Sequence, residues 1–280
     1  MAGSFLVNGE AVTAIEPDDR GLAYGDGLFE TIAVRHSKPL RWHAHLERLA
    51  EGAAQLGIAS PVADAWESDA ARLLSAASQE RQVLKLTLTR GGGGRGYAPH
   101  SASTPTRVAQ LTDWPAWPAS HAETGVVVRV CNIRLGINPA LAGLKHLNRL
   151  EQVLAARETL EAGVDEGLML DSDGRLVEGV RTNLLLVVDG TLVAPTLSRC
   201  GVRGVMREML LTGARALGIP TLETDCEPAL LARASEVLLC NSLIGIWPVR
   251  AVQGLPNTAL APGAVTRRLQ AWLAEADDAA

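Results

Sequence analysis

The sequence predicts a two-domain protein that combines helices and strands, in the α+β or α/β class. Segments with strand-like and helix-like patterns alternate along the first 115 residues. Residues 113–120 then contain two prolines and two tryptophans, and proline interrupts both helices and sheets. With 280 residues, of which 47% are hydrophobic, the chain can bury one large core or two medium ones. We therefore expect a smaller N-terminal α+β domain over residues 1–115 and a larger C-terminal domain over residues 121–280.

The N-terminal part is expected to begin with a hairpin. Asn8 and Gly9 form the strongest short hairpin cue and lie inside an apolar run over residues 5–15. The other expected elements of this part are a second hairpin from residues 28–34 and 38–42, helices over 43–56 and 63–77, and strands over 82–90 and 107–112.

The C-terminal part is expected to contain more strands than helices. Apolar runs predict strands over residues 125–131, 166–170, 183–188, 236–239 and 244–249. Helical spacing predicts helices from Lys145 to about residue 162, over 204–217 and over 264–274. The second domain would then carry Lys145 at the start of a helix.

Composition and charge exclude several classes of protein. The formal net charge is −5 and no block is rich in lysine and arginine, so we expect no nucleic-acid partner. No run of about 18 apolar residues occurs and the N-terminus has no signal-peptide pattern, which favours a cytoplasmic protein without a membrane partner. The four cysteines, Cys131, Cys200, Cys226 and Cys240, lack Cys-x-x-Cys spacing and are expected to be reduced, mostly buried thiols; we expect no metal site.

A glycine-rich run over residues 91–97 ends in Arg95-Gly-Tyr97. It lacks the Lys-Ser/Thr pair of a phosphate-binding P-loop, and Pro99 opposes a helix start, so a nucleotide site is disfavoured. Two interpretations stay open. The run is either a flexible loop, or a loop whose backbone approaches a ligand while Arg95 offers two parallel hydrogen bonds to a carboxylate.

Three further motifs are weak signals individually. Gly25-Asp26-Gly27 predicts a tight turn before a strand, and Glu178 is an acidic residue just before an apolar strand. Residues 200–207 open a helix with two glycines, and free N–H groups at such a helix start attract anions. Lys145 lies between a turn-rich stretch and an expected helix, so it is either a solvated lysine or a positioned amine.

The order of these motifs along the chain resembles the fold-type IV enzymes of pyridoxal phosphate, the class of the branched-chain and D-amino acid aminotransferases. The resemblance includes His45 to Arg48, the loop over residues 90–97, the Lys145 segment, Glu178 and residues 240–249. Within that class, the run around Lys145 and the Gly-Arg-Gly-Tyr loop are most similar to the aminodeoxychorismate lyases.

This resemblance implies pyridoxal 5′-phosphate as the cofactor and gives its ligands. Lys145 would hold the cofactor covalently and then act as general base and acid, and Glu178 would pair with the pyridine nitrogen. The phosphate would be bound by Arg48 and by the following residues of the helix start and of a later segment: Val205, Met206, Ser242 and Leu243.

The resemblance also implies a reaction and a substrate site. The reaction is the conversion of 4-amino-4-deoxychorismate to 4-aminobenzoate and pyruvate, a step of folate biosynthesis. Arg95, Tyr97 and Asn241 would bind the substrate, and Thr31 would help Lys145 to relay a proton. An aminotransferase for branched-chain or D-amino acids is the alternative on the same fold, and a non-catalytic binding protein is disfavoured by Lys145, Glu178 and Arg48 together. A homodimer is implied as well.

Overall fold

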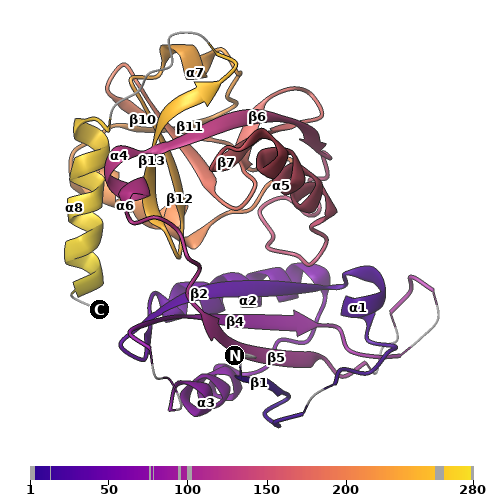
Figure 1. Cartoon of the computed structure of the whole chain (residues 1–280). Helices are drawn as coiled ribbons and strands as arrows, with labels where there is room; N and C mark the ends of the chain where they lie inside the picture. Colours follow the sequence, from indigo (N-terminus) through magenta and orange to yellow (C-terminus); the bar gives the residue numbers. More distant parts are fainter. Residues whose placement is uncertain are drawn as a thin grey trace. The chain divides into compact units, whose positions relative to one another are not determined.

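The computed structural model describes residues 4–12, 14–75, 77, 79–93, 96–99, 103–255 and 262–278 (Figure 1). The chain divides into two compact units. The first contains Met1–Ala116 together with Lys145–Asn148, and the second contains Trp117–Leu144 and Arg149–Ala280. Lys145, which we expected in the second domain, therefore packs with the first unit.

The first unit is a five-stranded antiparallel sheet with helices on one face. Its strands have the order β1-β5-β4-β2-β3. Its elements are β1 (Ser4–Val7), α1 (Arg20–Tyr24), β2 (Gly27–Arg35), β3 (Lys38–Pro39), α2 (Trp42–Leu56), α3 (Ala63–Leu74), β4 (Arg81–Thr89) and β5 (Thr106–Asp113). Leu28, Ile32 and Val34 of β2 are buried on the face that α2 covers, and Phe29 and Thr31 alternate onto the other face.

Most of the predicted elements of this unit are confirmed, and the first hairpin is wrong. The Asn8-Gly9 turn forms, but the returning chain makes only an isolated bridge between Val7 and Glu10. Strand β1 pairs with β5 instead. Val12 and Ile15 are exposed, so a second strand there would bury no apolar face. Helix α1 was not predicted, because five residues are too few to show a period.

The second unit is built around an eight-stranded sheet with the order β11-β10-β9-β12-β13-β6-β7-β8. Strand β8 also pairs with β9 through Glu178 and Asn183, so the strands from β9 to β8 close into a barrel. The elements are α4 (Ser120–Thr124), β6 (Val126–Leu135), α5 (Leu150–Ala162), β7 (Glu166–Asp171), β8 (Leu176–Gly179), β9 (Asn183–Val188), β10 (Thr191–Pro195), α6 (Val205–Ala216), β11 (Thr221–Thr224), α7 (Leu230–Arg233), β12 (Glu236–Asn241), β13 (Gly245–Gln253) and α8 (Ala264–Asp278).

Both faces of the central barrel strands are buried, which explains their continuous apolar runs. Leu184 and Leu186 of β9 join an inner cluster with residues of β6, β7, β12 and β13. Leu185 and Val187 point the other way, into a cluster with α6 and α8, which lie along the outside of the barrel (Figure 1). The five predicted strands and the two later helices are confirmed. The sequence patterns missed the short β8, β10 and β11.

Among the residues that the structure describes, no helix is long and apolar enough to cross a membrane.

Candidate active site

Lys145 lies on an extended segment rather than on a helix. The backbone N–H of Phe29 donates to the carbonyl of Lys145 (3.0 Å), and that of Leu147 donates to the carbonyl of Gly27 (2.9 Å). Strand β3 pairs only with Val34 and Arg35, so the first half of β2 has an open edge that this segment fills. Helix α5 begins only at Leu150, and the predicted helix start at Lys145 is wrong.

The side chain of Lys145 shares an aromatic ring with a second lysine. The Nζ atom of Lys145 lies 4.3 Å from the ring centre of Phe29, and that of Lys85 lies 5.5 Å from the same ring. Thr31 is two residues after Phe29 on β2 and directly opposite Lys85 on β4. One face of the first sheet therefore carries the expected catalytic pair, Lys145 and Thr31, next to an exposed ammonium group of Lys85.

Arg48 on α2 is fixed by a buried carboxylate. Its Nε donates to Oε1 of Glu30 (2.8 Å) and its Nη2 donates to Oε2 (2.5 Å), while Nδ1 of His45 lies 2.6 Å from Oε2. Burial by itself would raise the pKa of Glu30, but the charge of Arg48 and the hydrogen bonds from His45 and Arg48 outweigh it and lower this pKa to about 2. Arg48 is therefore a positioned cation rather than a solvated surface arginine.

The glycine-rich loop is described in part. Arg95 lies outside the described residues. Tyr97 is 86% exposed, and its ring packs edge-to-face on that of Tyr24 with the ring centres 5.6 Å apart. These are the only two tyrosines of the sequence.

Glu178 and Asn183 hold one residue of the second unit, Val202, through its two backbone polar groups. Oε2 of Glu178 accepts a hydrogen bond from the backbone N–H of Val202 (2.8 Å), and Nδ2 of Asn183 donates to the carbonyl of Val202 (2.8 Å). A Cβ on Gly204 would lie 1.9 Å from Oδ1 of Asn183, so only glycine allows this approach. The segment that leads into α6 is thereby fixed against the closing strands of the barrel.

Helix α6 begins at Val205 with Gly204 as its cap residue, and no side chain caps it. The backbone N–H groups of Val205 and Met206 lie in this first turn, where an anion is the favoured partner. Arg207 does not face a ligand there, because it is buried and donates to the carbonyl of Pro195 (3.0 Å) and to Glu223 (2.7 Å).

Ser242 and Leu243 lie in the tight turn between β12 and β13. Oδ1 of Asn241 accepts hydrogen bonds from the backbone N–H groups of Leu243 and Ile244 (both 2.9 Å), and its Nδ2 donates to the carbonyl of Arg181 (3.0 Å). The Asn241 amide therefore holds this turn, which gives it a structural role; its contact with a substrate stays a prediction.

Comparison with known proteins gives the family. Residues 27–252 match the family described as Amino-transferase class IV. The chain belongs to this family. It is 36% identical to an aminodeoxychorismate lyase from Vibrio harveyi over 268 residues, which cover 95% of this chain and 98% of that protein.

Solved structures of the class IV family agree with this assignment. The crystal structure of 4-amino-4-deoxychorismate lyase from Pseudomonas aeruginosa is 49% identical, with a TM-score of 0.91 over 97% of this chain and 98% of that one. The branched-chain amino acid aminotransferase of Escherichia coli is 26% identical, with a TM-score of 0.84 over 96% and 93%. The predicted fold-type IV architecture and the resemblance to aminodeoxychorismate lyases are confirmed.

Sequence reasoning missed several residues around the motifs of this class IV enzyme. Glu30 and Lys85 were not assigned to the site, although the scarcity of lysine, with three in the whole sequence, was an available signal for Lys85. Arg149 is a second missed cation. Burial lowers its pKa, and the nearby carboxylates of Glu178 and Glu151 oppose that effect.

Proposed function

We propose that this chain is a pyridoxal phosphate-dependent lyase that converts 4-amino-4-deoxychorismate to 4-aminobenzoate and pyruvate. The observation that carries the proposal is the 49% identity over nearly the whole chain to a solved 4-amino-4-deoxychorismate lyase. The relatives named as branched-chain aminotransferases are less similar, at 29% identity or below among those compared, so the aminotransferase alternative is less favoured.

Each of the proposed ligands has the chemistry that one part of pyridoxal phosphate needs. Its phosphate suits the backbone N–H groups of Val205 and Met206 and the guanidinium of Arg48, with Ser242 and Leu243 as further neighbours. Its pyridine nitrogen suits the Glu178 carboxylate, which the N–H of Val202 already orients. Its aldehyde needs a primary amine, and Lys145 supplies one. When bound, the cofactor supplies an electron sink at the carbon that carries the substrate amine.

The roles of the protein residues follow from the balance of the reaction. Lys145 removes the proton from the amine-bearing carbon, with Thr31 two residues from Phe29 to assist the transfer. The carbon–oxygen bond to the enolpyruvyl group breaks, the six-membered ring becomes aromatic, and the leaving group takes up a proton to become pyruvate. No water and no oxidant enter this balance. With the cofactor bound, the negative charge of Glu178 would keep a proton on the ring nitrogen.

The substrate carries two carboxylates, so the site needs cations besides those for the phosphate. We propose Arg95 and Tyr97 of the glycine-rich loop, with Asn241, for this task. Lys85 is an additional candidate, because its ammonium group shares the Phe29 ring with Lys145 and is otherwise on the open face of the sheet.

A cytoplasmic homodimer is part of the proposal. A row of exposed apolar side chains on α5 supports self-association, since large exposed apolar patches mark interfaces. The row consists of Leu150, Val153, Leu154 and Leu160. The four free, buried cysteines support a reducing compartment. Light scattering after gel filtration measures the molar mass in solution and thereby tests whether the protein is a dimer.

The test of the proposed function is a product assay. The purified protein, loaded with pyridoxal phosphate, is incubated with 4-amino-4-deoxychorismate, and 4-aminobenzoate and pyruvate are quantified. We expect equal amounts of the two products. Exchange of amino groups between branched-chain or D-amino acids and 2-oxo acids, without 4-aminobenzoate, would show that the alternative is right.

A further inference from the structure

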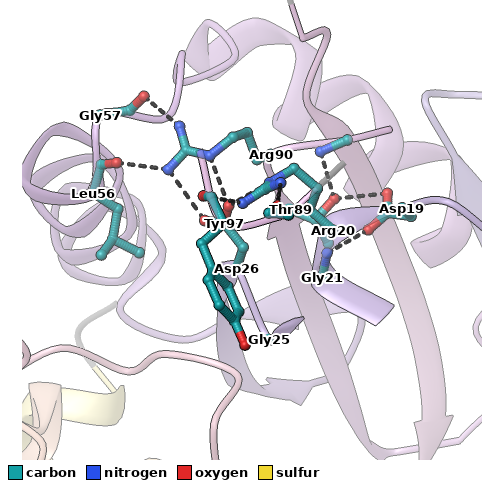
Figure 2. Close-up of polar contacts among 12 residues, drawn as sticks. Asp19, Arg20, Gly21, Gly25, Asp26, Leu56, Gly57, Thr89, Arg90 and Tyr97 are labelled. Atoms are coloured by element: carbon teal, nitrogen blue, oxygen red, sulfur yellow. Dashed lines mark hydrogen bonds and ion pairs between the residues drawn. The ribbon is translucent and has the colours of Figure 1, made fainter. Parts of the chain in front are cut away.

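Arg20 is a buried arginine with a hydrogen bond from each of its three side-chain nitrogens. Its side chain is 4% exposed. Nε donates to Oδ2 of Asp26 (2.9 Å), Nη1 donates to the carbonyl of Gly96 (2.9 Å) and Nη2 donates to the carbonyl of Tyr97 (2.8 Å) (Figure 2). One guanidinium group therefore joins the Gly25-Asp26-Gly27 turn to the glycine-rich loop. Gly96 and Tyr97 of this loop are 76 and 77 residues after Arg20 in the sequence.

Asp26 is the anchor of this arrangement, and it holds a second arginine. Nε and Nη2 of Arg90 donate to its two carboxylate oxygens (2.8 and 3.1 Å). Arg90 also donates to the carbonyls of Leu56 and Gly57 (both 2.7 Å), at the end of α2 (Figure 2). Burial by itself would raise the pKa of Asp26, but the hydrogen bonds and charges of Arg90 and Arg20 outweigh it and hold this pKa below its ordinary value.

The same turn is attached to the Lys145 segment. Gly25 accepts a hydrogen bond from Nδ2 of Asn148 (3.1 Å), and Gly27 accepts one from the backbone N–H of Leu147 (2.9 Å). The turn therefore contacts the lysine segment through its backbone, and the side chain of its aspartate binds Arg20, which in turn holds the loop. The cluster of Arg20, Asp26 and Arg90 lies between the two.

The beginning of the loop, at Gly91 and Gly92, is attached to the start of α1. The backbone N–H of Arg20 donates to the carbonyl of Gly91 (3.0 Å), and Gly92 forms a bridge with Asp19. Gly91 has a φ of +82°, and a Cβ there would lie 1.8 Å from the carbonyl oxygen of Thr104. The loop is thus held at Gly91 and Gly92 by backbone contacts, and at Gly96 and Tyr97 by the two hydrogen bonds that Arg20 donates to their carbonyls.

The exposed ring of Tyr97 depends on this contact as well. Its ring meets Tyr24, and the guanidinium carbon of Arg20 lies 4.9 Å from the centre of the Tyr24 ring. Tyr97 therefore has its carbonyl bound to Arg20 and its ring on a tyrosine that Arg20 also contacts. A change at Arg20 would release the backbone and the side chain of Tyr97 together.

We propose that Arg20, anchored by Asp26, is a positioning residue that holds Gly96 and Tyr97 in place and thereby sets the affinity of the enzyme for its dicarboxylate substrate. The inference rests on the proposed function, because the loop is the expected carboxylate-binding element. Arg20 is not among the residues that we expect to bind the cofactor or to move a proton. Its loss is therefore expected to weaken substrate binding while the cofactor and the chemical step are retained.

The experiment compares Arg20→Ala, Arg20→Lys and the control Arg72→Ala in the enzyme loaded with pyridoxal phosphate. Arg72 is matched, because its Nη1 also donates to the carbonyl of a turn glycine, Gly9 (2.6 Å), in the same unit. For Arg20→Ala we expect KM for 4-amino-4-deoxychorismate to rise about tenfold and kcat to change less than about twofold. Arg20→Lys should be intermediate, because one ammonium group cannot reproduce the planar fork.

Two further measurements separate positioning from general stability. Hydrogen exchange of the amides of residues 91–93 and 96–98 should become faster in Arg20→Ala and not in Arg72→Ala, while the visible absorbance of the bound cofactor stays the same. Guanidinium ion added to Arg20→Ala should restore a low KM. An unchanged KM together with unchanged exchange of the loop would overturn the proposal, as would a fall of kcat with loss of the cofactor in both Arg20 variants.

The failure of the proposed function has a different signature. In that case the wild-type enzyme forms no 4-aminobenzoate, whereas the exchange measurement still reports whether Arg20 holds the loop. Faster exchange in Arg20→Ala would then support the positioning role, and unchanged exchange would overturn it.

Discussion

The carboxylate of Glu178 accepts a 2.8 Å hydrogen bond from the backbone N–H of Val202, three residues before α6 begins. Asn183, which pairs with Glu178 where the barrel closes, binds the carbonyl of the same residue. The carboxylate expected at the cofactor ring and the helix start expected at the phosphate are therefore joined through one short segment. A substitution at either the carboxylate or the helix start should therefore affect the binding of both the ring and the phosphate.

Glu178→Gln tests the charge of this carboxylate. Glutamine keeps the shape and can still accept the hydrogen bond of Val202, but it cannot keep a proton on the cofactor ring nitrogen. We expect kcat/KM to fall at least tenfold, since a hydrogen bond to a charged group is worth about 1.5–3 kcal/mol. Steady-state assay of 4-aminobenzoate measures this, with Glu161→Gln on the exposed side of α5 as the control. Activity equal to wild type would show that Glu178 is not the ring partner.

Asn183→Ala tests whether the Val202 segment, which Asn183 holds, contributes to the binding of the cofactor phosphate. It removes the hydrogen bond to Val202, and we expect apoenzyme to bind pyridoxal phosphate about tenfold more weakly. Pyridoxal, which lacks the phosphate, should lose less affinity, because the helix start at Val205 contributes little to its binding. Absorbance titration with both compounds makes the comparison, and Asn132→Ala, an exposed position on β6, is the control. Equal losses for both compounds would contradict the coupling.

Lys145→Ala should abolish covalent attachment of the cofactor. Borohydride treatment followed by mass measurement of the intact chain should show the cofactor adduct in the wild type, in Lys38→Ala and in Lys85→Ala, and no adduct in Lys145→Ala. Lys85→Ala should instead raise KM, because its ammonium group lies over the Phe29 ring beside Lys145. An adduct that persists in Lys145→Ala would assign the amine to another lysine.

The network of Glu30, His45 and Arg48 predicts how acid destabilises the fold. The pKa of Glu30 is about 2 in the folded protein, below its ordinary 4.5, so the unfolded chain takes up a proton first as the pH falls. Its stabilisation is complete above the ordinary pKa and is lost as the pH falls towards 2. Burial also lowers the pKa of His45 below its ordinary 6.5, although the Glu30 hydrogen bond and charge oppose this, so stability should begin to fall already below about pH 6.5.

Glu30→Gln measures this contribution. The lowering of the Glu30 pKa from 4.5 to about 2 corresponds to about 3 kcal/mol of unfolding free energy. Urea unfolding at neutral and acidic pH should show a variant that is less stable at pH 7 and loses less stability between pH 5 and pH 3. Glu51→Gln, an exposed position on α2, should follow the wild type. A variant as stable as the wild type at pH 7 would show that the buried charge pair does not stabilise the fold.

The four thiols should be unreactive in the folded protein. Burial raises the pKa of Cys131 and Cys226 to about 11 and that of Cys200 and Cys240 to about 12. Since the thiolate is the reactive form, a thiol reagent at pH 8 should modify less than one group per chain in the native state and four after denaturation. Rapid reaction of one native thiol would contradict the burial.

The sequence by itself determined those features that local patterns encode. Alternation predicted β4 and helical spacing predicted α2, because the period of the apolar residues reports which side of an element is buried. The glycines before α6 indicated a helix start suited to an anion, and the order of the motifs was sufficient to give the family.

Only the tertiary structure decided how these features are held. Lys145 lies on an extended segment because β2 has an open edge there, and no spacing within its own segment reveals that edge. Arg48 is fixed by Glu30, 18 residues away, and Arg20 holds Gly96, 76 residues away. Such pairs form between side chains that only the folded backbone brings together, so the period of either segment contains no record of the other.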